Sequence, residues 1–387
     1  MHPMFSSRMD GIELSGLRKM FELVTTESVN LGLGEPDFQP PKEAVEAVEE
    51  AMRLGFNKYG PTNGIPALRE EISNRLKVYW KDVQPDNIVV TSSGSEGLFS
   101  GFLTFMDRGQ KALVPDPGFV LYRPHSLLTG SGHIDYHLSI DNEFRPDPDT
   151  IEKLIDGSCK VLVMNSPSNP TGGMVTRQDR DDIVDVAREH DLVIISDEVY
   201  DTMVFTGQTH YSFLGVYEKA MMVNSFSKIF SMTGWRMGYV AAPSEMAQKI
   251  GLAHYHMVAC PPTPIQYGAL EALRKSGSYV SEMVNEFERR RDMITKRLNE
   301  IPGFRAISPP GTFYSFPSYD LSNDHGRINS VDLAMELARN GLICSPGTTF
   351  GPKGEYHLRF SFVNSQDNIA RGMNILDDVA RKHRGPS

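Results

Sequence analysis

The chain has 387 residues, of which 40% are hydrophobic and 23% charged, and its formal net charge is −10. This length predicts two or three packing units, with enough buried core to shape a deep cleft. The negative charge and the lack of a basic run argue against nucleic acid or an anionic membrane surface as a partner.

Cysteine usage and the first residues predict a cellular compartment. Cys159, Cys260 and Cys344 lie far apart and form no CxxC pair, which favours a reducing environment over a disulfide framework. The opening residues, MHPMFSSRMDG, lack the apolar core of a signal peptide. The longest uncharged stretch, residues 251–270, contains histidines and prolines, so we expect a loop and a helix start there, not a membrane span. We therefore expect a cytoplasmic protein.

Helical patterns and short apolar runs alternate between about residues 41 and 245. Helical spacing occurs at residues 42–54, 66–80 and 177–189, and β-rich runs occur at 88–91, 112–114, 160–164, 192–196 and 221–223. Apolar runs bounded by turn residues are typical of strands buried on both faces of a mostly parallel sheet. The pattern predicts an α/β fold that binds its ligands at the carboxyl ends of the strands.

The last third of the chain has a different pattern. We expect a long charged helix at residues 279–299, short strands near 304, at 312–316, near 343 and at 356–362, and a final helix to 382. Another helix is expected from Ser330, as its N-cap, to Asn340, with Gly341 ending it. These elements predict a smaller α+β domain over residues 276–387. A large domain would span residues 41–275, and residues 1–40 would form an arm that belongs in part to the smaller domain.

Several common motifs are absent from the sequence. It contains no GxxxxGK[ST], no GxGxxG after a strand, no HExxH and no GxSxG. His254 and His256 are candidate metal ligands, but we expect no carboxylate or cysteine beside them. We therefore expect no bound metal.

Two segments that follow predicted strands are rich in the residues that form turns. TSSGSEG, residues 91–97, opens an apolar helix, so its backbone N–H groups could bind an anion at the positive end of that helix. A plain βα turn with a serine cap is the alternative. NSPSNPTGG, residues 165–173, predicts a rigid turn whose asparagine side chains point in fixed directions, and on its own it indicates no more than that.

Two further segments contain charged residues in positions that favour function. SDEVYD, residues 196–201, places an acidic residue at a strand's carboxyl end, which is either a ligand site or a solvated strand end. NSFSKIFSMTGWRMGY, residues 224–239, places Lys228 among Phe226, Ile229 and Phe230. An isolated lysine is usually solvated, whereas burial lowers the pKa of the amine and makes it a nucleophile toward carbonyls.

Taken in order, these four segments resemble the fold-type-I pyridoxal-phosphate aminotransferases of class I and II. The matching patterns are NPTG, DExY and SKxxxxTGWRxG, followed by a late arginine. The resemblance spans nearly the whole chain, through LGLGEPDF at 31–38, YGPTNGIPALR at 59–69, PPGTFYSF at 309–316, SPGTTFG at 345–351 and YHLRFSF at 356–362. It implies that the large domain binds pyridoxal phosphate.

The resemblance also implies which residues hold the cofactor ring. Lys228 would carry the cofactor as a Schiff base and then move a proton between the substrate Cα and the cofactor C4′. Asp197 would pair with the protonated ring nitrogen and keep the ring cationic. Asn169 and Tyr200 would contact the 3-oxygen of the ring, and Phe119 would stack on its face.

The phosphate group would bind where the first of the four segments opens its helix. The residues that match the phosphate site of the family are Gly94, Ser95, Glu96, Ser225 and Arg236. The first three would act mainly through backbone N–H groups, and the arginine through its bidentate fork. Tyr59 matches a tyrosine that reaches the phosphate of the neighbouring subunit, which implies a homodimer with shared active sites.

The small-molecule substrates implied by the resemblance are an amino acid and a 2-oxo acid. Arg359 would clamp the substrate α-carboxylate, helped by Gly34 and Asn169, and so orient the Cα–H bond. The amino group would pass to 2-oxoglutarate by a ping-pong mechanism.

The donor is predicted from the N-terminal arm. SGLRKMFEL, residues 15–23, resembles aspartate and aromatic aminotransferases, which favours aspartate, with aromatic amino acids or alanine next. Leu14, Leu17 and Phe21 would form either a hydrophobic lid over the substrate or part of the core.

Two other functions remain open from the sequence. A C–S lyase or an aminocyclopropane-carboxylate-synthase-like enzyme would use the same lysine but expel a leaving group, and it would need no 2-oxo acid. A non-enzymatic effector-binding domain is the remote alternative. Such domains are usually fused to a DNA-binding segment, and this sequence has no basic arm.

Overall fold

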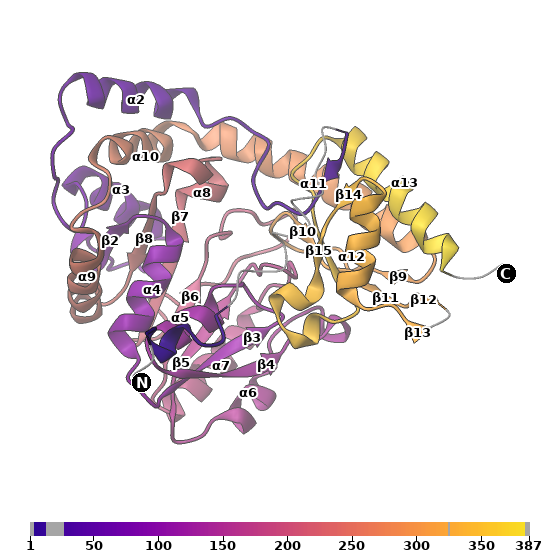
Figure 1. Ribbon diagram of the computed structural model, residues 1–387. Helices are drawn as coiled ribbons and strands as arrows, with labels where there is room; N and C mark the ends of the chain where they lie inside the picture. Colours follow the sequence, from indigo (N-terminus) through magenta and orange to yellow (C-terminus); the bar gives the residue numbers. More distant parts are fainter. Residues whose placement is uncertain (1–3, 13–26, 324–325, 384–387) are drawn as a thin grey trace.

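A computed structural model of the protein describes residues 4–12, 27–323 and 326–383 (Figure 1). Its centre is a seven-stranded sheet with the order β2-β8-β7-β6-β5-β3-β4. The strands are β2 (Ile88–Thr91), β3 (Lys111–Asp116), β4 (Gly132–His137), β5 (Cys159–Asn165), β6 (Val193–Asp197), β7 (Ala220–Ser225) and β8 (Gly238–Ala241). β8 is antiparallel to both of its neighbours, while β4, β3, β5, β6 and β7 pair in parallel. The predicted mostly parallel α/β fold is confirmed.

The central strands are apolar because both of their faces are buried. In β6, Val193 and Ile195 belong to one apolar cluster, whereas Ile194 belongs to another. Successive side chains of a strand point to opposite faces, so a strand covered on both sides needs apolar residues at every position. This explains the continuous apolar runs of the sequence.

Helices cover the two faces of the sheet. The helices of this part are α2 (Lys42–Arg53), α3 (Pro66–Leu76), α4 (Gly94–Phe105), α5 (Tyr122–Leu128), α6 (Pro148–Leu154), α7 (Arg177–Glu189), α8 (Phe226–Ile229), α9 (Ser244–Val258) and α10 (Thr263–Lys275). Apolar residues of α4, α5 and α9 pack on one face, and those of α3, α6, α7 and α10 pack on the other. The carboxyl edge of the sheet therefore remains free to form a site.

The C-terminal elements form a smaller unit, reached through the long helix α11 (Gly277–Glu300) (Figure 1). They are β9 (Phe304–Arg305), β10 (Tyr314–Ser315), β11 (Ser318–Tyr319), β12 (Ser322–Asn323), β13 (Gly326–Arg327), α12 (Ser330–Arg339), β14 (Leu342–Ile343), β15 (Ser345–Pro346), β16 (Leu358–Ser361) and α13 (Gln366–Lys382). β1 (Val29–Asn30) pairs in parallel with β14, so this part of the N-terminal arm lies in the smaller unit. The exact domain limits stay a prediction.

One expectation about local structure was wrong and another was incomplete. The N-cap of α12 is Asn329, not Ser330, because the Asn329 side chain accepts the N–H of Asp332 at 2.9 Å. In residues 251–270 the expected loop and helix start are present at 259–262 and at Thr263, where α10 begins, but the expectation missed that α9 continues to Val258. Gly341 does end α12, with φ of +91°. Among the described residues, no helix is both long enough and apolar enough to span a membrane.

Candidate active site

A cavity of about 270 Å³ lies at the carboxyl ends of β5, β6 and β7. The predicted site residues that line it are Gly34, Gly94, Ser95, Phe119, Asn169, Asp197, Tyr200, Ser225, Lys228, Arg236 and Arg359. They come from segments spread over more than 300 positions of the sequence, and the fold brings them to one place. Tyr59 and Glu96 are outside this lining.

The amine of the cavity belongs to Lys228, on the short helix α8 that follows β7. Its Nζ donates a hydrogen bond to the Gly34 carbonyl oxygen at 2.7 Å. Burial, followed by the positive charge of Arg359, lowers the pKa of Lys228 to about 8. A substantial fraction of the amine is therefore neutral near physiological pH, as a nucleophile toward a carbonyl carbon requires.

The carboxylate of the cavity belongs to Asp197, the buried last residue of β6. It accepts hydrogen bonds from the Tyr122 hydroxyl at 2.7 Å and from the Val199 N–H at 3.4 Å, and both donors are neutral. Burial raises the pKa of Asp197 to about 6, with the Tyr122 hydrogen bond acting in the opposite direction. At neutral pH the group is therefore a buried anion, and a cationic ring nitrogen in the cavity would stabilise it.

A further part of the cavity lining, called here the anion side, is suited to an anion. Gly94 begins α4, a helix of 12 residues, and Ser93 caps it by accepting the Glu96 N–H. The Ser225 hydroxyl and the Arg236 guanidinium complete this side. Gly238 of β8 is required here, because a Cβ at that position would lie 2.5 Å from the Gly94 nitrogen. Free N–H groups, a hydroxyl and a guanidinium fit a phosphate group.

The second arginine of the cavity, Arg359, is a buried cation on β16. Its Nη1 donates to Asn169 Oδ1 at 3.0 Å and its Nη2 donates to the Gly32 carbonyl oxygen at 2.6 Å. The guanidinium lies over the rings of Tyr314 and Phe350, 4.5 and 4.7 Å from their centroids. In the described part of the chain no acidic side chain pairs with it, and its Nε is buried without a partner. A buried cation with only neutral acceptors favours an anionic ligand such as a carboxylate.

Three aromatic residues of the site were missed from the sequence. Tyr122 holds Asp197, Tyr314 accepts a hydrogen bond from the Tyr200 hydroxyl at 3.1 Å, and Phe350 lines the cavity. Tyr314 belongs to PPGTFYSF and Phe350 to SPGTTFG, two motifs of the sequence analysis, and Tyr122 lies three residues after Phe119. The motifs could have indicated that these aromatic residues belong to the site, but the sequence analysis assigned them no role.

Two predicted residues lie away from the cavity. The carboxylate of Glu96 faces His254, whose Nδ1 lies 3.1 Å from its Oε2, so the expectation that no carboxylate lies near His254 was wrong. The Glu96 N–H donates to Ser93 and not into the cavity. The side chain of Tyr59 is 91% exposed, as a residue that reaches into a partner subunit must be, and that role stays a prediction.

Two loops of the cavity wall are held together by an ion pair. Asp116, at the end of β3, pairs with Arg123 at 3.3 Å and accepts the Lys353 N–H at 3.1 Å. Arg123 also donates to the Phe350 carbonyl oxygen at 3.1 Å. Gly351 permits this contact: its φ is +133°, and a Cβ there would lie 2.1 Å from Asp116 Oδ1.

Gly351→Ala is therefore expected to destabilise the fold by about 2 kcal/mol and to raise the KM for amino donors roughly tenfold, because it displaces Phe350. Denaturant unfolding and steady-state kinetics measure the two effects. Gly341→Ala is the matched control, since Gly341 also has a positive φ but would meet no atom within 4 Å. Equal effects of the two substitutions on KM would contradict this account of the wall.

A nucleophilic amine, a buried carboxylate and an anion site around one cavity of an α/β sheet are the groups that a pyridoxal-phosphate enzyme requires. Comparison with known proteins agrees. The family model "Aminotransferase class I and II" matches residues 26–376. The chain is 39% identical over 383 residues to a "Probable aspartate aminotransferase" of Methanocaldococcus jannaschii, covering 97% of this chain and all of the relative.

Two further similarities are as extensive. "Aromatic-amino-acid aminotransferase 2" of Thermococcus litoralis is 35% identical, covering 98% of this chain and 99% of the relative. The crystal structure of an aromatic aminotransferase from Pyrococcus horikoshii OT3 superposes with a TM-score of 0.87 at 35% identity, covering 95% of this chain and 99% of that one. The chain belongs to the class I and II aminotransferases, which are pyridoxal-phosphate-dependent enzymes.

Proposed function

We propose that this aminotransferase moves the α-amino group of aspartate to 2-oxoglutarate, with aromatic amino acids or alanine as the next donors. The observation that carries the amino-acid substrate is Arg359, a buried guanidinium in the cavity with no acidic partner among the described residues. The preference for aspartate is supported by relatives named as aspartate aminotransferases, including one of Pyrococcus abyssi at 36% identity. Leu14, Leu17 and Phe21 lie outside the described residues and add nothing to this choice.

The residues of the cavity fit the cofactor by their chemistry. Pyridoxal phosphate, when bound, supplies an electron-accepting ring and an aldehyde carbon that condenses with amines. Ser95, Ser225 and Arg236 would hold its phosphate, and Asp197 would hold its ring nitrogen. The 3-oxygen would be contacted by Asn169 and Tyr200, and the ring face by Phe119.

The chain's own groups then have distinct tasks. Arg359 binds the substrate α-carboxylate and thereby fixes the direction of the Cα–H bond. Lys228 Nζ takes up the Cα proton and returns it, and the pKa of about 8 suits an amine that must act as base and then as acid. One amine and one carboxylate clamp serve both the amino acid and the 2-oxo acid, so the two must bind in turn, which predicts ping-pong kinetics.

We infer that the protein acts in the cytoplasm as a homodimer with shared active sites. Large apolar residues close to Tyr59 in the sequence are exposed to solvent: Leu54 is 60% exposed and Phe56 is 40% exposed. Leu252 and Tyr255 of α9 are also half exposed, at 54% and 50%. Exposed apolar surface of this kind favours a second copy as the partner.

Tyr59→Phe tests the shared site. Loss of the hydroxyl is expected to weaken pyridoxal phosphate binding roughly tenfold in the dimer, because one hydrogen bond to a charged phosphate is lost. A spectroscopic titration measures the dissociation constant, and sedimentation measures the assembly state. Tyr211→Phe is the control, because Tyr211 is a partly exposed tyrosine that lies beside Arg180 and lines neither the cavity nor the surface around Tyr59. A monomeric wild-type protein that binds the cofactor with full affinity would contradict the proposal.

A further inference from the structure

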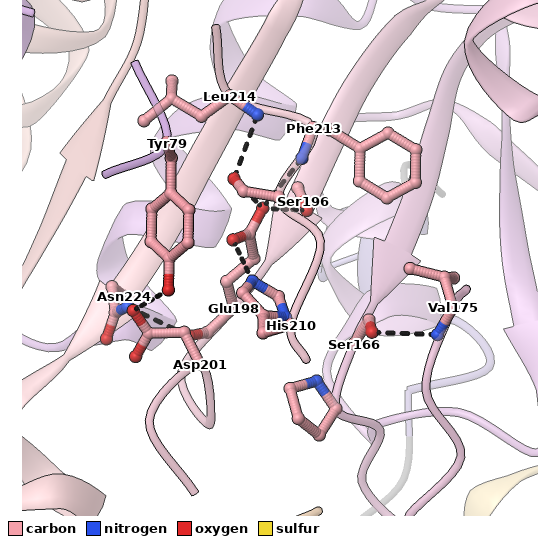
Figure 2. Close-up of polar contacts among 12 residues, drawn as sticks. Tyr79, Ser166, Val175, Ser196, Glu198, Asp201, His210, Phe213, Leu214 and Asn224 are labelled. Carbon is pink, nitrogen blue, oxygen red and sulfur yellow. Dashed lines mark hydrogen bonds and ion pairs between the residues drawn. The ribbon is translucent and has the colours of Figure 1, made fainter. Parts of the chain in front are cut away.

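Next to Asp197 in the chain is a second, fully buried carboxylate, that of Glu198 (Figure 2). It accepts hydrogen bonds from the Ser196 hydroxyl at 2.7 Å and the Ser212 hydroxyl at 2.9 Å, and His210 Nε2 lies 2.6 Å from its other oxygen. The side chain of His210 is 3% exposed. Figure 2 shows the side chains of Ser196, Glu198 and His210 directed at one another.

The contact between His210 and Glu198 has the character of an ion pair. A separation of 2.6 Å is that of a charge-assisted hydrogen bond. Burial lowers the pKa of His210, but the charge of Glu198 and its hydrogen bond outweigh burial, so the net shift is upward. A buried ion pair is weak support for stability, since apolar residues of the same volume serve as well or better. Stability alone therefore does not explain the pair, and its contacts point to another task.

The pair is connected to the cofactor site through the backbone. The Glu198 carbonyl oxygen accepts from Asn224 Nδ2 at 3.0 Å, and Asn224 Oδ1 accepts the N–H of Ser225, a residue of the anion side. At the other end of the same turn, Asp201 pairs with Arg75 at 2.8 Å. The turn that carries Asp197 and Tyr200 is thus fixed by an ion pair at each end.

A proton on His210 reduces the excess of negative charge around this turn. Three carboxylates, those of Asp197, Glu198 and Asp201, occur within five residues. The cations that face them are Arg75, His210 when protonated, and Lys228, which acts on Asp197 from the cavity. The remaining titratable groups that face the pair are the phenols of Tyr79 and Tyr239, which are neutral. The charge of Glu198 raises the pKa of Asp197, so an uncompensated Glu198 would favour a protonated, neutral Asp197.

We propose that His210 is a positioning residue for the reaction: paired with Glu198, it fixes the turn of residues 197–201 and cancels the charge of Glu198, so that Asp197 remains a carboxylate able to hold a protonated ring nitrogen. This inference rests on the proposed role of Asp197 and extends it to groups that touch neither cofactor nor substrate. His210 and Glu198 would thus act on the cofactor only through Asp197 and the turn.

The test compares His210→Gln, Glu198→Gln and the double variant in pyridoxal phosphate binding across about pH 5.5 to 9. His210→Gln is expected to weaken binding roughly tenfold at neutral pH and to move the acid limb of the binding profile up by about one pH unit, because the charge of Glu198 then acts on Asp197 without compensation. The double variant is expected to bind more tightly than His210→Gln, since two amides can hydrogen-bond without a net charge. A purely structural role predicts the reverse order.

His383→Gln is the matched control, because His383 Nε2 lies 2.7 Å from Glu336 Oε2, on helices remote from the cavity lining. It is expected to leave the profile unchanged. If His210→Gln does not fold, Glu198→Gln alone still tests the proposal: loss of the negative charge should move the acid limb down. An unmoved acid limb in both single variants, or a double variant no better than His210→Gln, would overturn the inference.

The proposed function is tested separately with the wild-type protein. A wild-type protein that binds the cofactor but transfers no amino group would refute the proposed function, and the binding profiles of the variants would still decide the role of His210. Absence of any effect of His210 on cofactor binding in an active enzyme would refute only the inference.

Discussion

Lys228→Ala is expected to reduce transamination by roughly a thousandfold or more, because one side chain supplies both the nucleophile and the proton carrier. The variant should still bind pyridoxal phosphate, held by the anion side and Asp197, but without a covalent bond. Rapid-mixing absorbance with an amino donor measures the loss of rate. Borohydride reduction followed by peptide mass spectrometry locates the covalent attachment, which the wild-type protein should show at Lys228 alone.

Lys296→Ala is the control for this experiment, since Lys296 has a side chain 78% exposed on α11 and takes no part in the cavity. Its rate and its reduced adduct should match the wild-type protein. Full activity of Lys228→Ala, or an adduct on another lysine, would show that the amine of the site has been wrongly assigned.

Arg359→Ala is expected to raise the KM of every amino donor by roughly two to three orders of magnitude, because a buried, hydrogen-bonded charge pair with the α-carboxylate is lost. Pyridoxal phosphate affinity should change little. The α-carboxylate is common to all donors, so the effect should be similar for aspartate, phenylalanine and alanine. Steady-state kinetics with the three donors, together with a cofactor titration, measures both properties.

Arg359→Lys separates the charge from the geometry of the clamp. Lysine keeps the positive charge but loses the planar fork and the packing between Tyr314 and Phe350, so we expect an intermediate KM. An effect confined to aspartate would identify Arg359 as a reader of the substrate side chain and would contradict its assignment to the α-carboxylate.

The fold was predictable where single elements carry a strong pattern. The strand Ile88–Thr91 and the helix Arg177–Glu189 agree with the sequence in both limits, because apolar runs and helical periodicity are local signals. β4 was missed because it is an edge strand with partly exposed polar residues, GHIDYH, and so has no continuous apolar run. β8 was missed because it is only four residues long and directly follows the TGWRM segment.

The site was predictable where residues fall in recognised motifs, and less so where a function depends on contacts between distant segments. Glu96 and His254 are 158 positions apart, and neither carries a sequence signal that predicts their pairing. The ion pair of Glu198 and His210 depends on how the chain returns to the sheet after β6, a loop path that no local pattern specifies. Burial itself, which sets the pKa values of Lys228 and Asp197, is a property of the assembled fold.

A half-reaction survey tests the central assignment most directly. The purified protein with bound pyridoxal phosphate is mixed separately with aspartate, phenylalanine, alanine and glutamate, without a 2-oxo acid. We predict that the visible absorbance of the Lys228-bound cofactor changes to that of its amine form, fastest with aspartate, with one equivalent of 2-oxo acid released per site. Release of ammonia with the original absorbance restored would indicate a lyase instead, and absence of any cofactor absorbance would contradict the assignment of Lys228.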